Sequence, residues 1–197
     1  MTVTSEHEQT LWNEAGVSRI SDIDGFPFPS HAALRSAVDN GTAYLGIEYA
    51  AARSLVSIRS VKSVLFVSAL GLVMPALALT SPIVAFFTGN WWALGGAISA
   101  LLGRFSANPY IPSKRFAKLL VAGAVLHIVI ARSIIQGSTW ISFCFAASAI
   151  ALWTLNHLAW KWAHDAALSS EAVAAYLFKT RNLHICDDHG EVYNVRG

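Results

Sequence analysis

Acidic residues are missing from the middle of this 197-residue chain. All twelve Asp and Glu residues lie at or before Glu48 or at or after Asp165, so the residues from Tyr49 to His164 contain none. Nine Lys and Arg residues give this block a formal charge of +9, whereas the two ends together carry −7. Charged residues make up only 13% of the chain, well below the quarter that is usual in soluble domains. The chain therefore combines a basic, apolar middle with acidic, polar ends.

Other scarcities exclude further classes of protein. Two cysteines, of which Cys144 lies in an apolar run, are too few for a disulfide scaffold. Residues 1–42 are polar and lack the apolar core of a cleaved secretory signal. The high hydrophobic content, 54%, excludes an intrinsically disordered chain. Because the basic residues sit at the edges of apolar runs, we expect no nucleic-acid partner. The class that remains is an integral membrane protein with several short-looped helices.

Four membrane-spanning helices are predicted from the apolar runs, each close to the ~20 residues that cross about 30 Å of hydrocarbon. They cover residues 63–79, 82–103, 116–135 and 140–162. Short links at Thr80-Ser81 and at residues 136–139 predict two antiparallel hairpins. Asn90-Trp91-Trp92 leaves the second span open to two alternatives. The favoured alternative is the full span over residues 82–103. In the other, the motif marks an interface that leaves only residues 92–103 as helix and makes residues 82–90 a re-entrant or loop-like segment.

The distribution of Lys and Arg predicts the orientation of these spans. Basic residues lie before the first span, between the second and third spans, and after the fourth, whereas the other two connections contain none. Only Arg132 lies near the side of those two connections. Since cytoplasmic loops carry the excess of positive charge, we expect both termini and the middle loop to be cytoplasmic, in a multi-pass protein of the cell inner membrane.

The N-terminal end, residues 1–61, is predicted to form short cytoplasmic helices. A first helix follows Ser5, and a second begins after Ser30 and ends near Asn40-Gly41, with a Pro-rich loop between them. From Thr42 onward, apolar residues at helical spacing predict a third helix, which either runs straight into the first span or lies along the membrane surface before it. These residues are Tyr44, Ile47, Ala51, Leu55 and Ile58.

The C-terminal end, residues 163–197, is predicted to contain a helix and a small β-hairpin. The fourth spanning helix continues through Asp165, and Ser169 and Ser170 can cap a further helix. Residues 183–195 predict a hairpin around Asp187-Asp188-His189-Gly190. Because two strands alone are marginally stable, we expect this hairpin to dock on the N-terminal segment or on a partner. The predicted fold is thus an all-α membrane domain, residues 62–162, with small cytoplasmic elements at both ends.

Two basic side chains of the third span, His127 and Arg132, have a bland and a functional interpretation. Lys118 and Arg132 are 14 residues apart on one helix face, so each can reach its own membrane surface. His127 lies near the middle of the membrane, where a bond to a neighbouring helix would satisfy it. The functional alternative is an anion path lined by Arg132 and His127 in an oligomer.

Polar and small residues mark two helix faces. The end of the fourth span has a polar stripe, which is either a wet face or a docking seam for a helix or a lipid headgroup; it comprises Asn156, His157, Lys161 and His164. Gly96, Ala100 and Gly103 form a small-residue face that lets helices approach closely. The tail residues His184, Cys186 and His189 match no zinc-ligand spacing. We expect no catalytic residue, no cofactor and no metal.

Three classes of function remain. The first is a non-enzymatic structural or assembly component of a larger inner-membrane complex, such as secretion, conjugation or defence machinery. The second is a homo-oligomeric pore or permeabilising effector, and the third is a small membrane enzyme. The first is favoured because the polar ends are small and poorly self-sufficient, as docking segments are. The expected partners are membrane lipid and either other membrane proteins or further copies of the chain.

Overall fold

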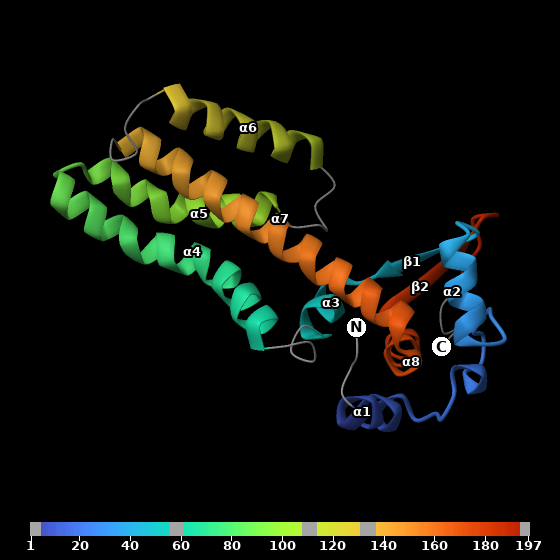
Figure 1. The fold of residues 1–197 in the computed structure, drawn as a ribbon. Coiled ribbons are helices and arrows are strands. Elements are labelled where there is room, and N and C mark those ends of the chain that lie inside the picture. Colours follow the sequence, from blue (N-terminus) through green and yellow to red (C-terminus); the bar gives the residue numbers. More distant parts are fainter. Residues whose placement is uncertain (1–4, 56–60, 108–113, 131–136, 194–197) are drawn as a thin grey trace. The chain divides into compact units, whose positions relative to one another are not determined.

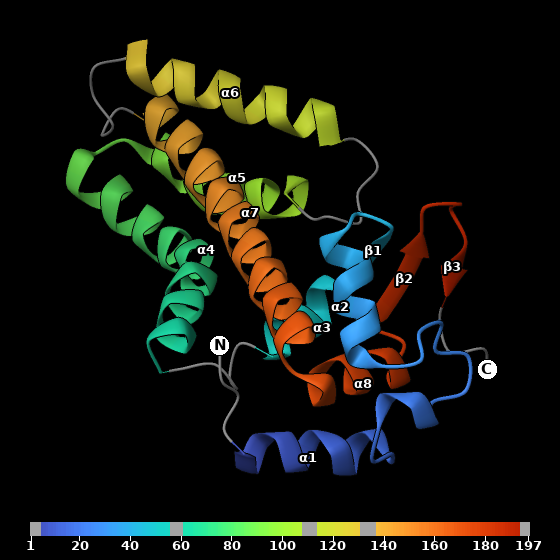
Figure 2. The same ribbon diagram turned by 45° about the vertical axis from the view of Figure 1, so that its right-hand side comes forward.

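The computed structural model describes residues 5–55, 61–107, 114–130 and 137–193. The chain is mostly helical and divides into two compact units. Unit 1 combines Met1–Val64 with Leu158–Gly197, and unit 2 consists of Leu65–His157 (Figures 1 and 2). The two ends of the chain therefore fold together, and the apolar middle of the sequence forms a unit of its own between them.

Unit 1 is built around a three-stranded antiparallel sheet with strand order β1-β2-β3. Its elements are α1 (Ser5–Ala15), η1 (Ile20–Asp22), α2 (His31–Asp39), β1 (Ala43–Ile47), α3 (Tyr49–Ser54), the end of α7, α8 (Glu171–Lys179), β2 (Leu183–Asp187) and β3 (Val192–Tyr193). The predicted cap of α2 is confirmed, because the Ser30 hydroxyl accepts a hydrogen bond from the Ala33 amide at 3.2 Å. The predicted hairpin is confirmed as β2 and β3, and it docks on the N-terminal segment through β1.

The helix predicted to start at Thr42 is wrong in its first part, where the chain forms strand β1. Burial alternates along this strand, with Ala43, Leu45 and Ile47 buried and the residues between them exposed. That period of two matches a strand with one covered face. The helix prediction rests on the spacing of the apolar residues and takes no account of this alternation. It also lacks the long-range pairing with β2, in which Leu45 lies opposite Ile185. Helix begins only at Tyr49, in α3.

Contacts between the two chain ends hold unit 1 together. The backbone amide of Ile20 donates to Glu171 Oε1 at 2.9 Å, and His31 Nε2 lies 2.8 Å from the carbonyl oxygen of Ala167. The rings of Phe26 and Phe178 meet edge to face with centroids 5.1 Å apart. Each contact joins residues more than 130 positions apart in sequence, so neither end has a complete core without the other.

Unit 2 contains the helices of the apolar block. These are α4 (Val61–Thr88), η3 (Trp91–Leu94), α5 (Gly95–Ser106), α6 (Lys114–Ile130) and α7 (Gly137–Ser169), of which the first and the last extend into unit 1. Among the residues that the structure describes, two segments are long and apolar enough to cross a membrane, Val64–Thr88 in α4 and Ser138–Ser169 in α7. At 1.5 Å per residue α5 is only about 18 Å long, shorter than the hydrocarbon core.

The predicted break between the first two spans is also wrong. Helix α4 continues through Thr80 and Ser81, whose hydroxyls donate to the carbonyl oxygen of Leu77 at 3.2 Å and 2.8 Å. Such back-bonding satisfies a polar side chain inside a helix, so no turn is needed. The turn lies instead at Gly89, with φ of +63°, and at Asn90, whose side chain accepts a hydrogen bond from the Trp92 amide. A single helix over residues 82–103 and a loop-like segment over residues 82–90 are therefore both wrong, because residues 82–88 end α4 and α5 begins only at Gly95.

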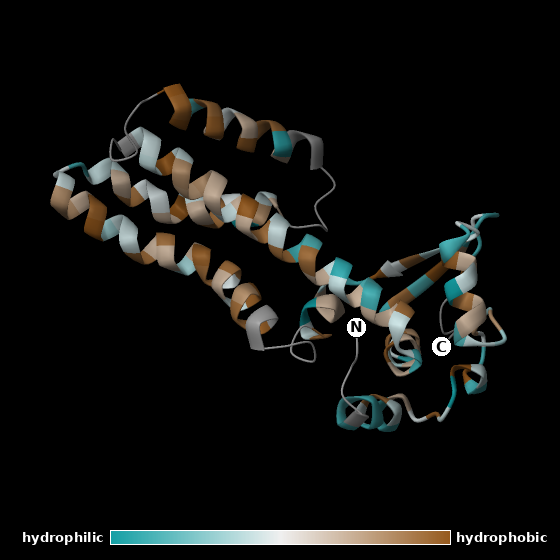
Figure 3. Cartoon of the chain, viewed as in Figure 1, coloured by the Kyte–Doolittle hydropathy of each residue, from teal (hydrophilic) through white to brown (hydrophobic). Residues whose placement is uncertain are grey.

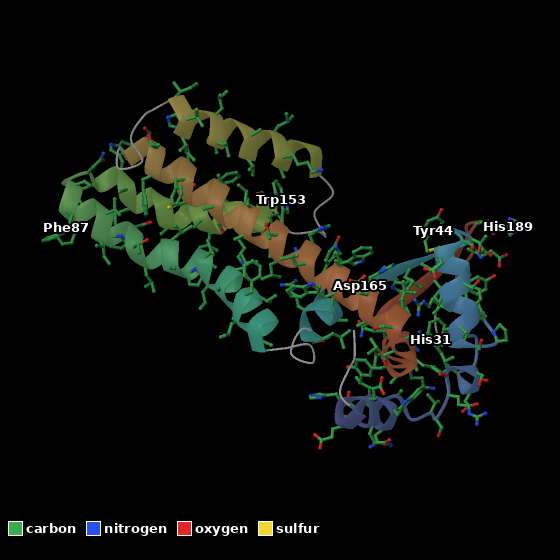
Figure 4. The ribbon with its side chains drawn as sticks, viewed as in Figure 1. His31, Tyr44, Phe87, Trp153, Asp165 and His189 are labelled. Atoms are coloured by element: carbon green, nitrogen blue, oxygen red, sulfur yellow. The ribbon has the colours of Figure 1, made fainter. Side chains whose placement is uncertain are left out.

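The surface of unit 2 is apolar and its interior contains polar groups. Most large exposed hydrophobic residues of the described chain lie in this unit, among them Phe87, which is 81% exposed at the end of α4 (Figures 3 and 4). Buried polar side chains also gather here, and these are Ser81, Ser99, Thr139, Ser148 and Asn156. A water-soluble domain of this size rarely exposes so much contiguous apolar surface. This pattern is typical of a surface that faces lipid.

Candidate functional site

The small-residue face of α5 packs closely against α4 and α7. A Cβ atom on Gly96 would lie 2.6 Å from both Ser81 Oγ and Trp140 Nε1, which are themselves hydrogen-bonded at 3.1 Å. A Cβ atom on Gly103 would overlap the carbonyl oxygen of Phe145, and Ala100 between them is fully buried. This face therefore brings three helices of unit 2 together. It is covered by α4 and α7 of the same chain.

Only one of the two residues of the anion-path hypothesis, His127, belongs to the part of the chain that the structure describes. His127 is exposed on α6, and its Nδ1 atom lies 2.8 Å from the hydroxyl of Ser142 on α7. A neutral histidine can make this bond, so His127 has a partner on a neighbouring helix. Arg132 lies outside the described residues.

The polar stripe on α7 separates into residues with different surroundings. His157 and Lys161 are exposed, whereas His164 is partly buried and stacks on Trp160 with ring centroids 5.0 Å apart. Asn156, in contrast, is only 4% exposed. The structure therefore does not bring these four side chains together as one continuous wet face.

Asn156 has an unmet hydrogen-bonding requirement. Within the described ranges, neither its amide nitrogen nor its amide oxygen has a hydrogen-bond partner. Asn156 is four residues after Leu152 and directly follows Leu155, and both leucines belong to the buried core of unit 2. It thus lies on the helix face that packs inward. An unpaired buried amide costs about 1–3 kcal/mol, so its presence requires an explanation.

The sheet of unit 1 has one covered and one open face. Leu45, Leu183 and Ile185 point to the covered side and are buried. On the other side, the register places Tyr44, Cys186 and Val192 in one row across the three strands. We call this set the sheet row.

The sheet row is unusual for its exposure. Tyr44 is 62% exposed and Val192 is 57% exposed, and no other large hydrophobic residue in the described part of unit 1 is classed as exposed. Single exposed apolar residues are common on protein surfaces. In the described part of unit 1, however, both exposed large hydrophobic residues lie in the same row, two strands apart. The row is therefore the candidate interaction surface of unit 1.

Acidic groups adjoin one end of the sheet row. Asp187 Oδ1 accepts hydrogen bonds from the amides of His189 and Glu191, which fixes the turn, and Tyr193 donates to Glu191 Oε2 at 2.9 Å. That bond, aided by burial and by the charges of Glu191 and Asp187, raises the pKa of Tyr193 to about 12. Because folding raises this pKa, the neutral phenol stabilises the hairpin below about pH 10, and this contribution is lost between about pH 10 and 12.

The described tail residues do not converge on a metal site. Within the ranges that the structure covers, no group of three or more His, Cys, Asp or Glu side chains could hold a metal ion.

Compared with family models, curated proteins and solved structures, the chain matches none. The function must therefore be argued from the sites above.

The sheet row is absent from the prediction made from the sequence, because that prediction places Tyr44 on a helix. The alternation of Ala43, Leu45 and Ile47 with Tyr44 and Gly46 was the available signal. The same prediction includes Asn156 in the polar stripe of α7. Asn156 is four residues after Leu152 and seven after Ala149, and because both of these lie in the core, this spacing was the sign that Asn156 faces inward.

Proposed function

We propose that this chain is a non-enzymatic, multi-pass component of the cell inner membrane that helps to assemble a larger membrane complex. The observation that carries this proposal is the division of the chain into an apolar unit with a polar interior and a small polar unit made from both chain ends. The first unit suits a bilayer, and the second is too small for most catalytic domains but offers a surface for docking. A secretion or conjugation machine, or a membrane-bound defence complex, would suit such a component.

Unit 1 contains both ends of the chain, and this supports an even number of membrane crossings between them. Strand β1 from the N-terminal end pairs with β2 from the C-terminal end, so both ends must be on the same side of the membrane when the unit folds. Helices α4 and α7 supply two crossings, and α5 and α6 complete a four-helix membrane domain between them. The excess of Lys and Arg on that side makes the cytoplasm its expected location.

The sheet row is the proposed docking surface for a partner protein. Tyr is among the residues that contribute most to protein interfaces because its ring buries a large area at low entropic cost. Asp188 and Glu191, both exposed beside the row, favour a partner segment in which apolar residues are flanked by Lys or Arg. Removing residues 183–197 would also remove β2 and its buried Leu183 and Ile185, so a point substitution separates docking from folding better than truncation does.

Tyr44→Glu is expected to release the partner and leave unit 1 folded. The full-length chain, tagged near Met1, would be extracted gently from its native cells, and the retained proteins quantified by mass spectrometry. The wild type should retain other membrane proteins in fixed ratio. Loss of a central Tyr anchor of about 2 kcal/mol would lower their recovery about 30-fold.

The matched control for this experiment is Asn13→Glu, which adds the same charge at an exposed position of α1. It should leave recovery unchanged. Equal recovery by wild type and Tyr44→Glu would reject the sheet row as the docking surface. Recovery of the chain alone, as a ring of fixed copy number that releases dye from liposomes, would favour the homo-oligomeric pore instead.

A further inference from the structure

Strand β1 lies at an edge of the sheet, and half of its backbone groups point away from the sheet. The Glu48 amide donates to the carbonyl oxygen of Asn182 at 3.0 Å, and the Asp188 amide donates to that of Thr42 at 3.1 Å. In an antiparallel pair, alternate residues direct their backbone groups to the same neighbour. The even-numbered residues of β1 therefore bond to β2, and the odd-numbered residues direct their N–H and C=O groups to the outer edge.

The outward backbone groups belong to Ala43, Leu45 and Ile47. Among the residues that the structure describes, none donates to or accepts from these groups, since β1 is the first strand in the sheet order and pairs with β2 alone. The side chains of all three residues are buried, so the free groups border a packed core. An unpaired row of this kind is a template for one more strand.

Strand β1 has none of the features that usually protect an edge strand. Such edges carry Lys, Pro, a bulge or an inward-pointing charge. The sequence of β1 is Ala-Tyr-Leu-Gly-Ile, which contains no charge and no proline, and its register with β2 is continuous from Ala43 to Ile47. An edge without this protection would pair with other chains indiscriminately unless a specific strand covers it.

The charges of the β1 segment are negative. Between Arg35 and Arg53 the only charged residues are Asp39, which pairs with Arg35 at 3.8 Å, and Glu48. Glu48 is exposed at the end of β1 and forms no ion pair with a described residue, and Asp188 is exposed beside the start of β1. A second copy of this segment would bring the same carboxylates, whereas a segment with Lys or Arg at its ends would be attracted at both ends of β1.

We propose that an extended, basic segment of the partner protein adds to the sheet as a further strand along the outer edge of β1. Its backbone would pair with Ala43, Leu45 and Ile47, and main-chain hydrogen bonds of this kind supply the affinity in strand addition. On the open face its alternate side chains would lie beside Tyr44, which is 62% exposed, and beside Gly46, which has no side chain to exclude them. This inference rests on the proposed docking function of unit 1 and specifies how the partner binds.

Amide hydrogen exchange at single-residue resolution tests the added strand. The full-length chain, extracted gently from its native cells with its partner, would be compared with the same chain produced without the partner in a heterologous host. The amides of Ala43, Leu45 and Ile47 should exchange about 10-fold more slowly in the complex, because their outward N–H groups become bonded. The amides of Tyr44 and Gly46, which already bond to β2, should change much less. Equal changes at all five residues, or none, would overturn the added strand.

Substitutions at Gly46 test the charge of the partner segment. A Cβ atom there would meet only His184, at 3.7 Å and 3.8 Å, which is ordinary van der Waals contact, so the strand accommodates a side chain. Gly46→Lys should lower recovery of the partner about 10-fold, because Lys protects the edge and repels a basic segment. Gly46→Glu is the matched control and should keep the recovery of the wild type. Equal recovery in the two variants, whether kept or lost, would overturn the basic character of the segment.

The outcomes separate this inference from the proposed function. A partner that Tyr44→Glu releases, but that leaves no alternating protection along β1, keeps the docking function and overturns the added strand. A second copy of the chain found paired through β1 would overturn the assignment of the edge to a basic partner. Recovery of the chain with no partner would overturn the docking function and this inference together.

Discussion

Gly103→Ala is expected to disrupt the packing of unit 2 more than any other single methyl group. The added Cβ would overlap the carbonyl oxygen of Phe145, a backbone atom of α7 that cannot rotate away. Helices α5 and α7 would have to separate, and the buried cluster around Ala149 and Leu152 would lose contacts. Overpacking of a core costs about 1–3 kcal/mol, and a clash with backbone belongs at or above the top of that range.

This prediction is tested by thermal unfolding in detergent together with protease sensitivity. Gly123→Ala is the matched control, because Gly123 lies in the middle of α6 with nothing within 4 Å of the added Cβ. It should be neutral or slightly stabilising, since Ala favours helix over Gly by roughly 1 kcal/mol. An equal midpoint for Gly103→Ala and Gly123→Ala would contradict the close approach of α5 and α7.

Phe178→Ala is expected to unfold unit 1 and to expose both ends of the chain at once. Phe178 is fully buried on α8, where its ring contacts that of Phe26 from the N-terminal segment. Truncating a buried Phe costs about 3–5 kcal/mol, a large share of the stability of a unit this small. Because the core is shared, the N-terminal loop and the C-terminal hairpin should lose protection together.

Hydrogen exchange followed by mass spectrometry resolves the two ends. In Phe178→Ala, peptides from α2 and from β2 should exchange faster by similar factors, whereas peptides from α4 should change little. Tyr44→Ala is the control, because Tyr44 is exposed and its truncation should leave protection intact. Faster exchange in β2 alone would show that the two ends do not form one cooperative unit.

The long apolar helices of unit 2 could be predicted from the sequence because hydropathy and charge are summed over long segments. The absence of acid between Tyr49 and His164 and the length of the apolar runs lead directly to the two long apolar helices. The position of the turn between α4 and α5 could not be predicted in this way. Thr80 and Ser81 resemble a break, but their hydroxyls bond to Leu77 inside the helix.

The candidate sites depend on contacts that local patterns do not encode. The sheet row exists because β1 pairs with β2 across some 140 residues, and without that pairing Tyr44 fits a helix equally well. Asn156 is buried because α7 packs into the core of unit 2 on the face that carries Leu152, and this packing comes from helices far apart in the sequence. The residue types are visible in the sequence, but these long-range contacts are not.

The measurement that tests the central claim most directly is the sidedness of the two chain ends. Single cysteines would be introduced by Glu14→Cys, Lys179→Cys or Ser138→Cys into a chain carrying Cys144→Ala and Cys186→Ser, and labelled in sealed vesicles with a membrane-impermeant maleimide. The account predicts that positions 14 and 179 label from the same side, the cytoplasmic one, and that position 138 labels from the other. Labelling of positions 14 and 179 from opposite sides would contradict it, because unit 1 could not then form from both ends of one chain.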